Sequence, residues 1–285
     1  MRIPVGSATP QDDHTARLSD RFDTSVPHPA RRYNYWLGGK DNFAVDRESG
    51  DRIAAAYPAI RTLARENRAF LQRAVRYLAA EAGVRQFLDI GTGIPTADNT
   101  HEVAQAVAPE SRVLYADNDP MVLAHARALL TSSPAGTTAY LDADLRDPER
   151  ILAADELHRT LDLSRPVALL LVAVAHFLTD ADRPYEVVGR LVEALPSGSY
   201  LVLSHVTIDL MPAEVVERMR VELAARTVER DAVPRSRAEF ARFFDGLDLV
   251  EPGVVPVTQW RAEVPESERP PLAEASIYGA VARKL

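Results

Sequence analysis

The chain of 285 residues contains no cysteine. This absence excludes disulfide bonds, thiolate zinc sites and cysteine nucleophiles, and it fits the reducing cytoplasm in which we expect the protein to reside. The chain also lacks an excess of basic residues, because 33 Lys and Arg stand against 41 Asp and Glu for a net charge of −8. Such a chain has no broad positive field for non-specific nucleic-acid binding, and we expect no nucleic-acid partner.

Long apolar stretches are missing as well. The longest run, residues 167–175, is far shorter than the ~20 residues that a membrane helix needs, and residues 1–30 are polar with no apolar segment typical of a signal peptide. We therefore expect no membrane association. The run suits a strand buried on both faces of a parallel sheet. The histidines show no metal-ligand spacing, so we expect no protein-bound metal.

The order of polar and apolar segments predicts three regions. Residues 1–25 read as a flexible tail, residues 26–84 as an N-terminal helical cap with a helix over 61–81, and residues 85–285 as an α/β domain. In the domain we expect helices between strands at residues 85–90, 112–117, 137–141, 166–174, 200–206, 247–257 and 277–282, with a helix over 212–230 in the C-terminal third. This alternation predicts a parallel sheet with helices on both faces, and ligands of such sheets bind beyond the carboxyl ends of the strands.

A glycine-containing turn follows the first predicted strand. Gly91 and Gly93 let the backbone approach a ligand closely, and N–H groups at the next helix start can bind polar atoms. An ordinary strand–helix turn is the alternative. Asp89 stands where dinucleotide-binding turns usually keep an apolar residue, and Thr96 stands where a nicotinamide-binding turn has its third glycine. The turn therefore favours a ligand other than a nicotinamide dinucleotide.

Carboxylates also follow the second and third predicted strands. Asp117 ends the second strand, where an acid can accept hydrogen bonds from both hydroxyls of a ribose. Asp142 and Asp144 follow the third strand, where a carboxylate can accept from an exocyclic amine such as that of adenine. Each acid alone could be a solvated loop residue. One acid after each of three successive strands indicates a site for a nucleoside-containing ligand.

This set of residues resembles the class I S-adenosylmethionine (SAM) methyltransferases. Asp89, Gly91 and Gly93 match their first motif, Asp117 matches the ribose acid, and Asp144, or with less support Asp142, matches the adenine acid. The resemblance implies a Rossmann-like, seven-stranded sheet with an antiparallel last strand, SAM as cofactor and S-adenosylhomocysteine (SAH) as product. It also implies cofactor contacts from four residues next to these motifs, Thr92, Asn118, Leu145 and Val174.

A closer resemblance extends over nearly the whole chain after residue 25. Residues 33–43, 67–71 and 93–102 are similar to the signature segments of an actinobacterial-type SAM methyltransferase family long catalogued as a domain of unknown function. Pro95, which replaces the third glycine of the first motif, belongs to the pattern of this group. The resemblance implies the fold and the cofactor but not the methyl acceptor.

Four further residues are candidates for the site. His176 follows the fourth predicted strand, and its imidazole titrates near neutrality, as a general base requires. Tyr33 and Tyr35 are weaker catalytic candidates in an aromatic segment that forms either packed core or a lid, and Arg68 is a candidate to bind the methionine carboxylate. We predict methyl transfer to a small-molecule acceptor. The alternatives are a catalytically silent SAM-binding regulatory protein and a nucleotide-dependent oxidoreductase, which Thr96 argues against.

Overall fold

The computed structural model describes residues 23–129, 132–224 and 232–285. Within these residues eight strands form one sheet in the order β3-β2-β1-β4-β5-β8-β6, and β7 also pairs with β8. The strands are β1 (Gln86–Ile90), β2 (Arg112–Asp117), β3 (Thr137–Asp142), β4 (Ala168–Val172), β5 (Tyr200–Val206), β6 (Asp248–Leu249), β7 (Val255–Pro256) and β8 (Ile277–Arg283). β1 to β5 pair in parallel, and β8 runs antiparallel to β5. This topology confirms the predicted Rossmann-like fold with an antiparallel last strand, but the sheet has eight strands rather than the seven expected.

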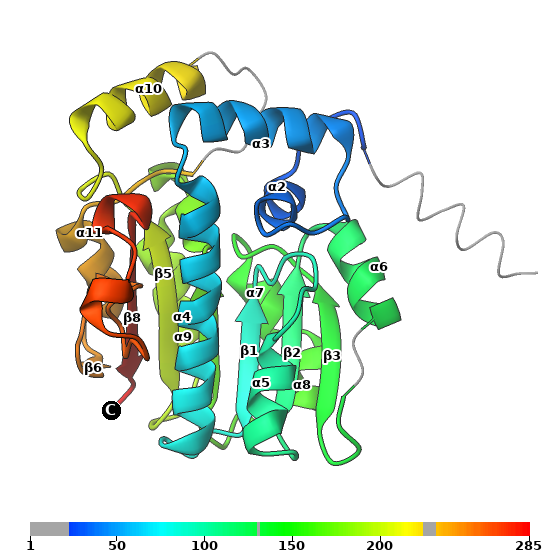
Figure 1. Cartoon of the computed structure of the whole chain (residues 1–285). Helices are drawn as coiled ribbons and strands as arrows, with labels where there is room; N and C mark the ends of the chain where they lie inside the picture. The colour runs from blue at the N-terminus through cyan, green and yellow to red at the C-terminus, as the bar shows by residue number, and fades with distance from the viewer. Residues whose placement is uncertain (1–22, 130–131, 225–231) are drawn as a thin grey trace, which may run out of the picture.

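Helices flank both faces of the sheet (Figure 1). They are α2 (Pro29–Trp36), α3 (Ala44–Ala56), α4 (Ile60–Ala80), α5 (Thr100–Val107), α6 (Pro120–Leu129), α7 (Pro148–Leu152), α8 (Asp155–Thr160), α9 (Pro184–Glu193), α10 (Ala213–Ala224) and α11 (Arg237–Ala241). Short 3-10 turns lie at Ala175–Phe177, Asp180–Asp182, Arg242–Phe244, Glu266–Glu268 and Leu272–Glu274.

The central strands β1, β2, β4, β5 and β8 are buried on both faces, as their apolar sequences predict. Side chains alternate along each strand, so that Leu88 of β1 enters one core and Phe87 enters the other. The first core includes Leu157 of α8 and Leu191 of α9, and the second includes Phe70 of α4. The long helix α4 therefore packs directly on the sheet, which fixes the orientation of everything attached to its N-terminal end.

A cap of shorter helices covers the carboxyl ends of the parallel strands. In Figure 1 α3 lies across the top of the sheet, α2 lies between α3 and the strand ends, and α10 lies beside α3. The ion pair of Arg52 with Glu222, at 3.4 Å, and the hydrogen bond from Arg218 Nε to the Ala56 carbonyl, at 3.2 Å, join α3 to α10. The cap is therefore built from two segments that are far apart in the sequence.

Two predicted elements differ from the structure. The strand predicted over 247–257 is wrong, because β6 and β7 are separate two-residue strands. A turn at residues 251–252 and Gly253, whose φ is +77°, divide them, although both pair with β8. The helix predicted over 212–230 is described as Ala213–Ala224, and residues 225–231 lie outside the described residues.

The predicted tail, residues 1–25, lies mostly outside the described residues, which begin at residue 23. The boundaries predicted for the cap and the catalytic domain stay a prediction. None of the helices in the described parts of the chain is both long enough and apolar enough to span a membrane.

Candidate active site

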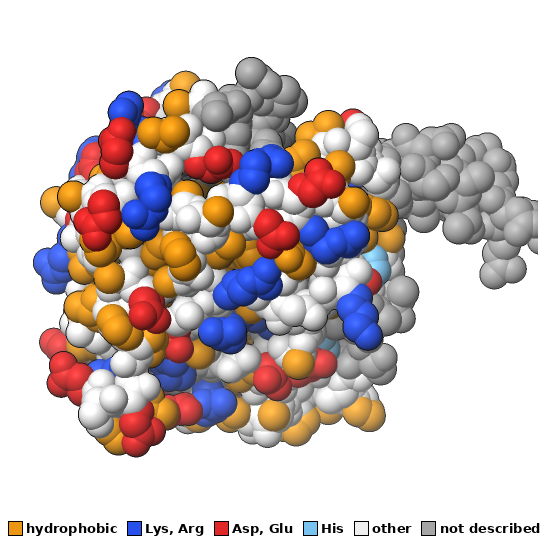
Figure 2. Space-filling model, turned by 45° about the horizontal axis from the view of Figure 1, so that its top comes forward, with side chains coloured by type: hydrophobic (Ala, Val, Ile, Leu, Met, Phe, Trp, Pro, Cys, Tyr) orange, Lys and Arg blue, Asp and Glu red, His pale blue; other side chains and the backbone are white. Residues whose placement is uncertain are grey.

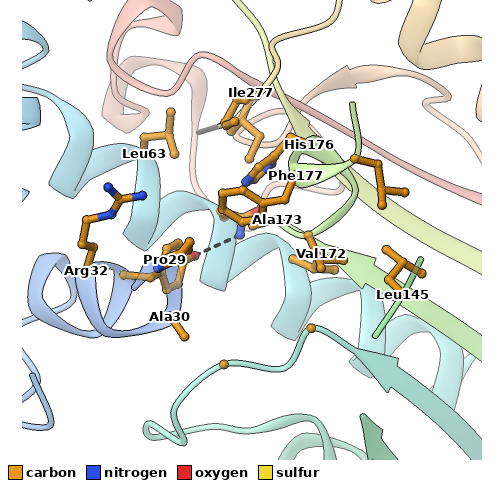
Figure 3. Close-up of a pocket in the computed structure, with 18 of the residues that line it drawn as sticks. Pro29, Ala30, Arg32, Leu63, Leu145, Val172, Ala173, His176, Phe177 and Ile277 are labelled. Atoms are coloured by element: carbon orange, nitrogen blue, oxygen red, sulfur yellow. Dashed lines mark hydrogen bonds between the residues drawn. The ribbon is translucent and has the colours of Figure 1, made fainter. Parts of the chain in front are cut away.

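A cavity of about 290 Å³ lies between the carboxyl ends of the strands and the cap (Figure 3). It is lined by all of the residues predicted to bind the cofactor: Arg68, Asp89, Gly91, Thr92, Gly93, Asp117, Asn118, Asp144, Leu145 and Val174. His176 and Tyr33 line it as well, whereas Tyr35 and Asp142 do not. The fold thus brings residues from six separate segments to one place.

The glycine turn after β1 forms the floor of the cavity. Gly91 and Gly93 have φ values of +72° and +68°, a backbone conformation that glycine adopts without strain. A Cβ atom on Gly91 would lie 2.2 Å from Val174 Cγ2, so the turn also needs glycine to pack against the end of β4. This close packing leaves the backbone of the turn facing the cavity.

Asp117 anchors this turn from the end of β2. Its Oδ2 accepts a hydrogen bond from Gly93 N at 2.9 Å, and its Oδ1 accepts one from Asp119 N at 2.9 Å. Burial raises the pKa of Asp117 to about 6, although both backbone hydrogen bonds oppose that shift. Each carboxylate oxygen has two acceptor positions, so one position on each oxygen is left for a ligand.

Asp89 lies beside Asp117 in the same buried floor. Its Oδ2 accepts a hydrogen bond from Thr100 Oγ1 at 2.6 Å, which ties the end of β1 to the start of α5. Burial raises the pKa of Asp89 to about 6, and the neighbouring Asp117 adds to the shift. The two acids therefore hold a concentrated negative charge against the glycine turn above about pH 6.

Asp144 reaches the cavity after β3, whereas the side chain of Asp142 is exposed and lies outside it. Asp144 Oδ1 accepts from the backbone and Nε of Arg146, both at 2.9 Å, and Oδ2 accepts from Arg146 Nη2 at 2.5 Å and from Asn118 Nδ2 at 2.8 Å. Burial acts to raise the pKa of Asp144, but these hydrogen bonds outweigh it and hold the pKa below its usual range. All four acceptor positions are in use, so a ligand amine would have to displace one donor.

Arg68 borders the opposite side of the cavity from α4. Its Nη2 donates to the carbonyls of Ala97 and Asp98, both at 3.1 Å. These bonds hold the guanidinium beside the loop that follows the glycine turn. The group is therefore placed where it can bind an anion entering the cavity.

His176 lies in the 3-10 turn after β4 and is buried. Its Nδ1 has no hydrogen-bond partner among the described residues, and its ring packs edge-on against His205 at 5.7 Å. Burial lowers the pKa of His176 well below its usual value, and the neighbouring His205 and Arg235 lower it further. The imidazole is therefore neutral across the physiological range, and the ring lines the cavity with its Nδ1 buried and without a partner among the described residues.

The two candidate tyrosines lie on different faces of α2. Tyr33 lines the cavity, but its hydroxyl donates to the Ala64 carbonyl at 3.0 Å and accepts from Asn67 Nδ2 at 2.9 Å. Burial raises its pKa, which makes the phenol a poor base. Tyr35 points elsewhere, with its hydroxyl 2.7 Å from Asp51 and its ring under Arg61. The structure therefore does not bring Tyr35 to the site.

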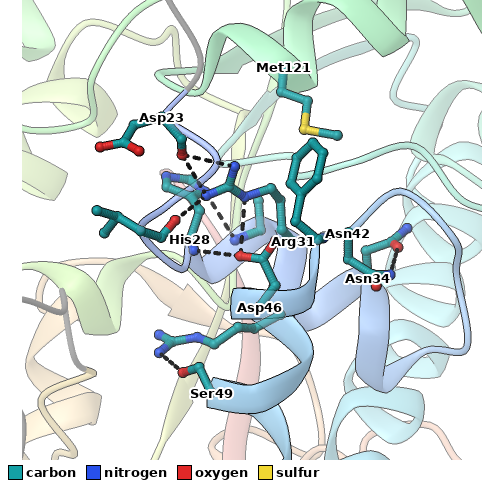
Figure 4. A network of polar contacts seen from close by, with 12 residues as sticks. Asp23, His28, Arg31, Asn34, Asn42, Asp46, Ser49 and Met121 are labelled. Carbon is teal, nitrogen blue, oxygen red and sulfur yellow. Dashed lines mark hydrogen bonds and ion pairs between the residues drawn. The ribbon is translucent and has the colours of Figure 1, made fainter.

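A buried carboxylate holds the cap over the cavity (Figure 4). Asp46 at the start of α3 is fully buried, accepts from His28 N at 2.9 Å and Phe43 N at 2.8 Å, and pairs with Arg31 Nε at 3.2 Å. His28 Nδ1 lies 2.9 Å from Asp119, two residues after Asp117. This network links the entry to α2, the start of α3 and the end of β2.

Several residues of the cavity were not predicted from the sequence. Asn67 on α4 accepts from Ser204 Oγ at 2.6 Å and thereby couples the cap side to β5. Met219 on α10 and Tyr57 after α3 close the cavity from above. Met219 belongs to the apolar face of the helix predicted over 212–230. The sequence does not show that this face covers the cavity, which only the folded chain reveals.

Comparison with known proteins shows the family. A family model described as S-adenosyl methyltransferase matches residues 15–285. The chain belongs to this family. A DUF574 family protein from Streptomyces avermitilis MA-4680 is 50% identical and superimposes with a TM-score of 0.88, covering 92% of this chain and 99% of its own. A methyltransferase structure from Thermobifida fusca YX is 41% identical with a TM-score of 0.83, covering 92% and 96%. No match is found among the curated proteins.

The family uses SAM as its cofactor, and the cavity of this methyltransferase fits that molecule. Asp117 keeps two free acceptor positions beside the glycine turn, and Arg68 lies on the far side of the same floor. The space between them is bordered by backbone rather than by bulky side chains at Gly91 and Gly93. Ribose hydroxyls and a carboxylate are the groups that such a floor can bind.

Proposed function

We propose that this protein transfers the methyl group of SAM to a small-molecule acceptor bound under the cap. The observation that carries the proposal is the cavity in which Asp89, Asp117 and Asp144, from three adjacent strand ends, meet an apolar space under the cap. A cofactor held by the strand ends and an acceptor held by the cap would then share one cavity. Sharing it favours transfer because the reactants are held together in a fixed orientation.

The cofactor roles follow from the groups that remain available. Asp117 would accept the two ribose hydroxyls, and the backbone around Gly91 and Gly93 would border the methionine part. Arg68 would bind the methionine carboxylate. The adenine would lie beside Asn118, Asp144 and Leu145. Its amine would replace Asn118 as a hydrogen-bond donor to Asp144.

SAM, when bound, supplies a methyl group on a sulfonium. A nucleophilic atom of the acceptor takes this methyl group directly, and SAH leaves. The protein then has to orient the acceptor and, for a hydroxyl or an N–H acceptor, to receive its proton. His176 is the candidate for that proton, because its neutral, buried Nδ1 has no other partner among the described residues. Its lowered pKa makes it a weak base, so it would receive the proton as the new bond to carbon forms.

A small acceptor suits this site better than a nucleic acid. The cavity of about 290 Å³ lies beneath α3 and α10, and a volume of this size suits a small molecule rather than a duplex. On the face that carries the cap, Lys and Arg side chains are interspersed with Asp and Glu and do not form a continuous basic surface (Figure 2). Phosphate binding depends on such a surface.

The proposal is tested by measuring SAH release from SAM over a panel of small metabolites. Turnover on at least one acceptor is expected, and with that acceptor His176→Ala should lose about 10²–10⁴ in kcat while SAH affinity stays close to wild type. His158→Ala is the matched control, because His158 is exposed on α8 and does not line the cavity. SAH binding without turnover on any acceptor would refute the proposal, and an unchanged kcat in His176→Ala would remove the role of His176 as base.

A further inference from the structure

The part of the cavity under the cap differs in chemistry from the part at the strand ends. We call it the acceptor chamber, and its walls come from α2, α3, α4, α10 and the segments next to them. It is lined by Trp36, Ile53, Tyr57, Leu63, Met211 and Met219. All six residues belong to or pack against one apolar cluster that also includes residues of the sheet. Apolar walls of this kind gain most by contact with an apolar ligand.

The aromatic residues of the chamber turn their polar atoms away from it. Trp36 Nε1 donates to the Gly50 carbonyl at 3.2 Å, and the Tyr57 hydroxyl donates to the Ala273 carbonyl at 2.8 Å. The Tyr33 hydroxyl likewise donates to a backbone carbonyl, that of Ala64. Each ring therefore lines the cavity while its donor is satisfied by the backbone, and a polar ligand would find few partners among them.

The three arginines that border the cavity have other partners. Arg32 Nη1 donates to Ser49 Oγ at 3.1 Å, Arg146 pairs with Asp144 at 2.5 Å, and Arg68, whose Nη2 donates to two loop carbonyls, is the residue proposed to bind the methionine carboxylate. The carboxylates of the cavity, in contrast, lie at the strand ends. A charged acceptor placed in the chamber would therefore lose its hydration without gaining a facing counter-ion, which is costly.

One polar side chain with an unpartnered nitrogen lies where the two parts of the cavity meet. His176 lies there beside Phe177, with Leu63 and Ile277 across the same space (Figure 3). Its Nδ1 is buried and has no hydrogen-bond partner among the described residues. A buried imidazole nitrogen without a partner is costly, and one hydrogen-bonding group on a ligand would relieve that cost.

We infer that the acceptor is an uncharged, predominantly hydrophobic small molecule with one hydrogen-bonding group directed at His176. This inference rests on the proposed function, since it names the class of molecule that the methyl group is transferred to. It excludes amino acids, organic acids and phosphorylated metabolites as acceptors, because each of these carries a charge that the apolar walls would leave without a partner.

The test compares two probes of one shape, 2-naphthol and 2-naphthoate, by titration calorimetry at pH 7 with and without saturating SAH. The neutral probe is expected to bind about tenfold more tightly than the carboxylate, or better. Met219→Glu should weaken 2-naphthol binding by about tenfold or more, because it places a charge in the chamber wall. Val221→Glu is the matched control, since Val221 lies on the same helix with 58% of its surface exposed.

The SAH affinity of each variant shows separately whether the part of the cavity at the strand ends is intact and whether the variant is folded. Equal or tighter binding of 2-naphthoate, no binding of either probe, or wild-type 2-naphthol affinity in Met219→Glu would each overturn the inference. Loss of 2-naphthol binding in both variants would overturn it too, because the effect would not be specific to the chamber. Failure of wild-type protein to bind SAH would refute the proposed function instead, and the titrations without SAH would still decide the chemistry of the chamber.

Discussion

Replacing Asp117 with asparagine tests the cofactor site at the residue with the clearest geometry. In the wild type the two backbone donors, Gly93 N and Asp119 N, take one acceptor position on each carboxylate oxygen. Two positions remain for the two ribose hydroxyls. An asparagine has a single oxygen, so it can replace only one of the two carboxylate oxygens. Its amide N–H groups would face one backbone donor and one hydroxyl, so one hydroxyl loses its acceptor and the other keeps only a neutral one.

The expected loss follows from the strength of these bonds. A hydrogen bond to a charged acceptor contributes about 1.5–3 kcal/mol, and the hydroxyls can recover part of the loss by accepting from the new amide. A net loss of about 2–3 kcal/mol weakens SAH binding by about 30-fold to 150-fold. Titration calorimetry of Asp117→Asn against wild type at pH 7.5 measures it directly.

Asp142→Asn is the matched control for this experiment. Asp142 is a carboxylate at the end of the neighbouring strand, pairs in register with Asp117 and lies outside the cavity. Its replacement should leave SAH affinity within about twofold of wild type. Unchanged affinity in a folded Asp117→Asn protein, or an equal loss in both variants, would refute the assignment of Asp117 to the ribose.

Three further predictions follow from the buried charges. SAH affinity should fall by up to about tenfold between pH 7.5 and pH 5, because protonation of Asp117 below its pKa of about 6 removes the acceptor that the ribose needs. Calorimetry across this pH range measures the change, and a constant affinity would contradict the assignment. Burial raises the pKa of Asp89 from its ordinary value of 3.8 to about 6, so the folded chain binds more protons than the unfolded chain between these two values. The contribution of protonated Asp89 to the free energy of unfolding is complete below about pH 4. About 3 kcal/mol of it is lost as the pH rises through about 6. Asp89→Asn removes the charge while its oxygen can still accept from a hydroxyl, so urea unfolding at pH 8 should show a variant more stable than wild type, and a less stable variant would contradict the prediction. Asp46→Ala leaves the buried Arg31 without its carboxylate partner, which should lower the local stability of the cap by about 3–5 kcal/mol. Amide exchange over residues 29–56 should then be faster, and unchanged exchange there would contradict the prediction.

The sheet and the floor of the cavity were predictable because their signals are local. Each parallel strand is a short apolar run, and the carboxylates Asp89, Asp117 and Asp144 stand at or directly after strand ends. Since carboxyl ends of parallel strands meet at one edge, the sequence alone placed these acids together. In the structure, the register of β1, β2 and β3 places Asp89 opposite Tyr115 and Asp117 opposite Asp142.

The cap was harder to predict in detail because tertiary contacts hold it together. The sequence of α3 contains Gly50, which usually disfavours a helix interior. In the structure a Cβ at Gly50 would lie 2.9 Å from the Tyr35 ring, so the glycine permits the close packing of α2 on α3. The helical turn of α2 also explains the tyrosines: Tyr33 and Trp36, three residues apart, share the face toward the cavity, and Tyr35 does not.

The environment of His176 lay beyond sequence reasoning for a different reason. Its place after the fourth strand was evident, but its low pKa depends on burial and on Arg235, which comes from a segment almost sixty residues later. The same segment supplies the hydrogen bond from Val233 N to the His176 carbonyl, at 2.8 Å. Such long-range packing sets the protonation state of the residue and has no signature in the local sequence.

A crystal structure of the protein with SAH tests the central claim most directly. We expect density for SAH in the cavity, with both ribose hydroxyls on the Asp117 carboxylate and the adenine beside Asn118 and Leu145. The acceptor chamber under α3 and α10 should stay free of the cofactor. SAH bound away from Asp117, or filling the chamber under the cap, would contradict the account.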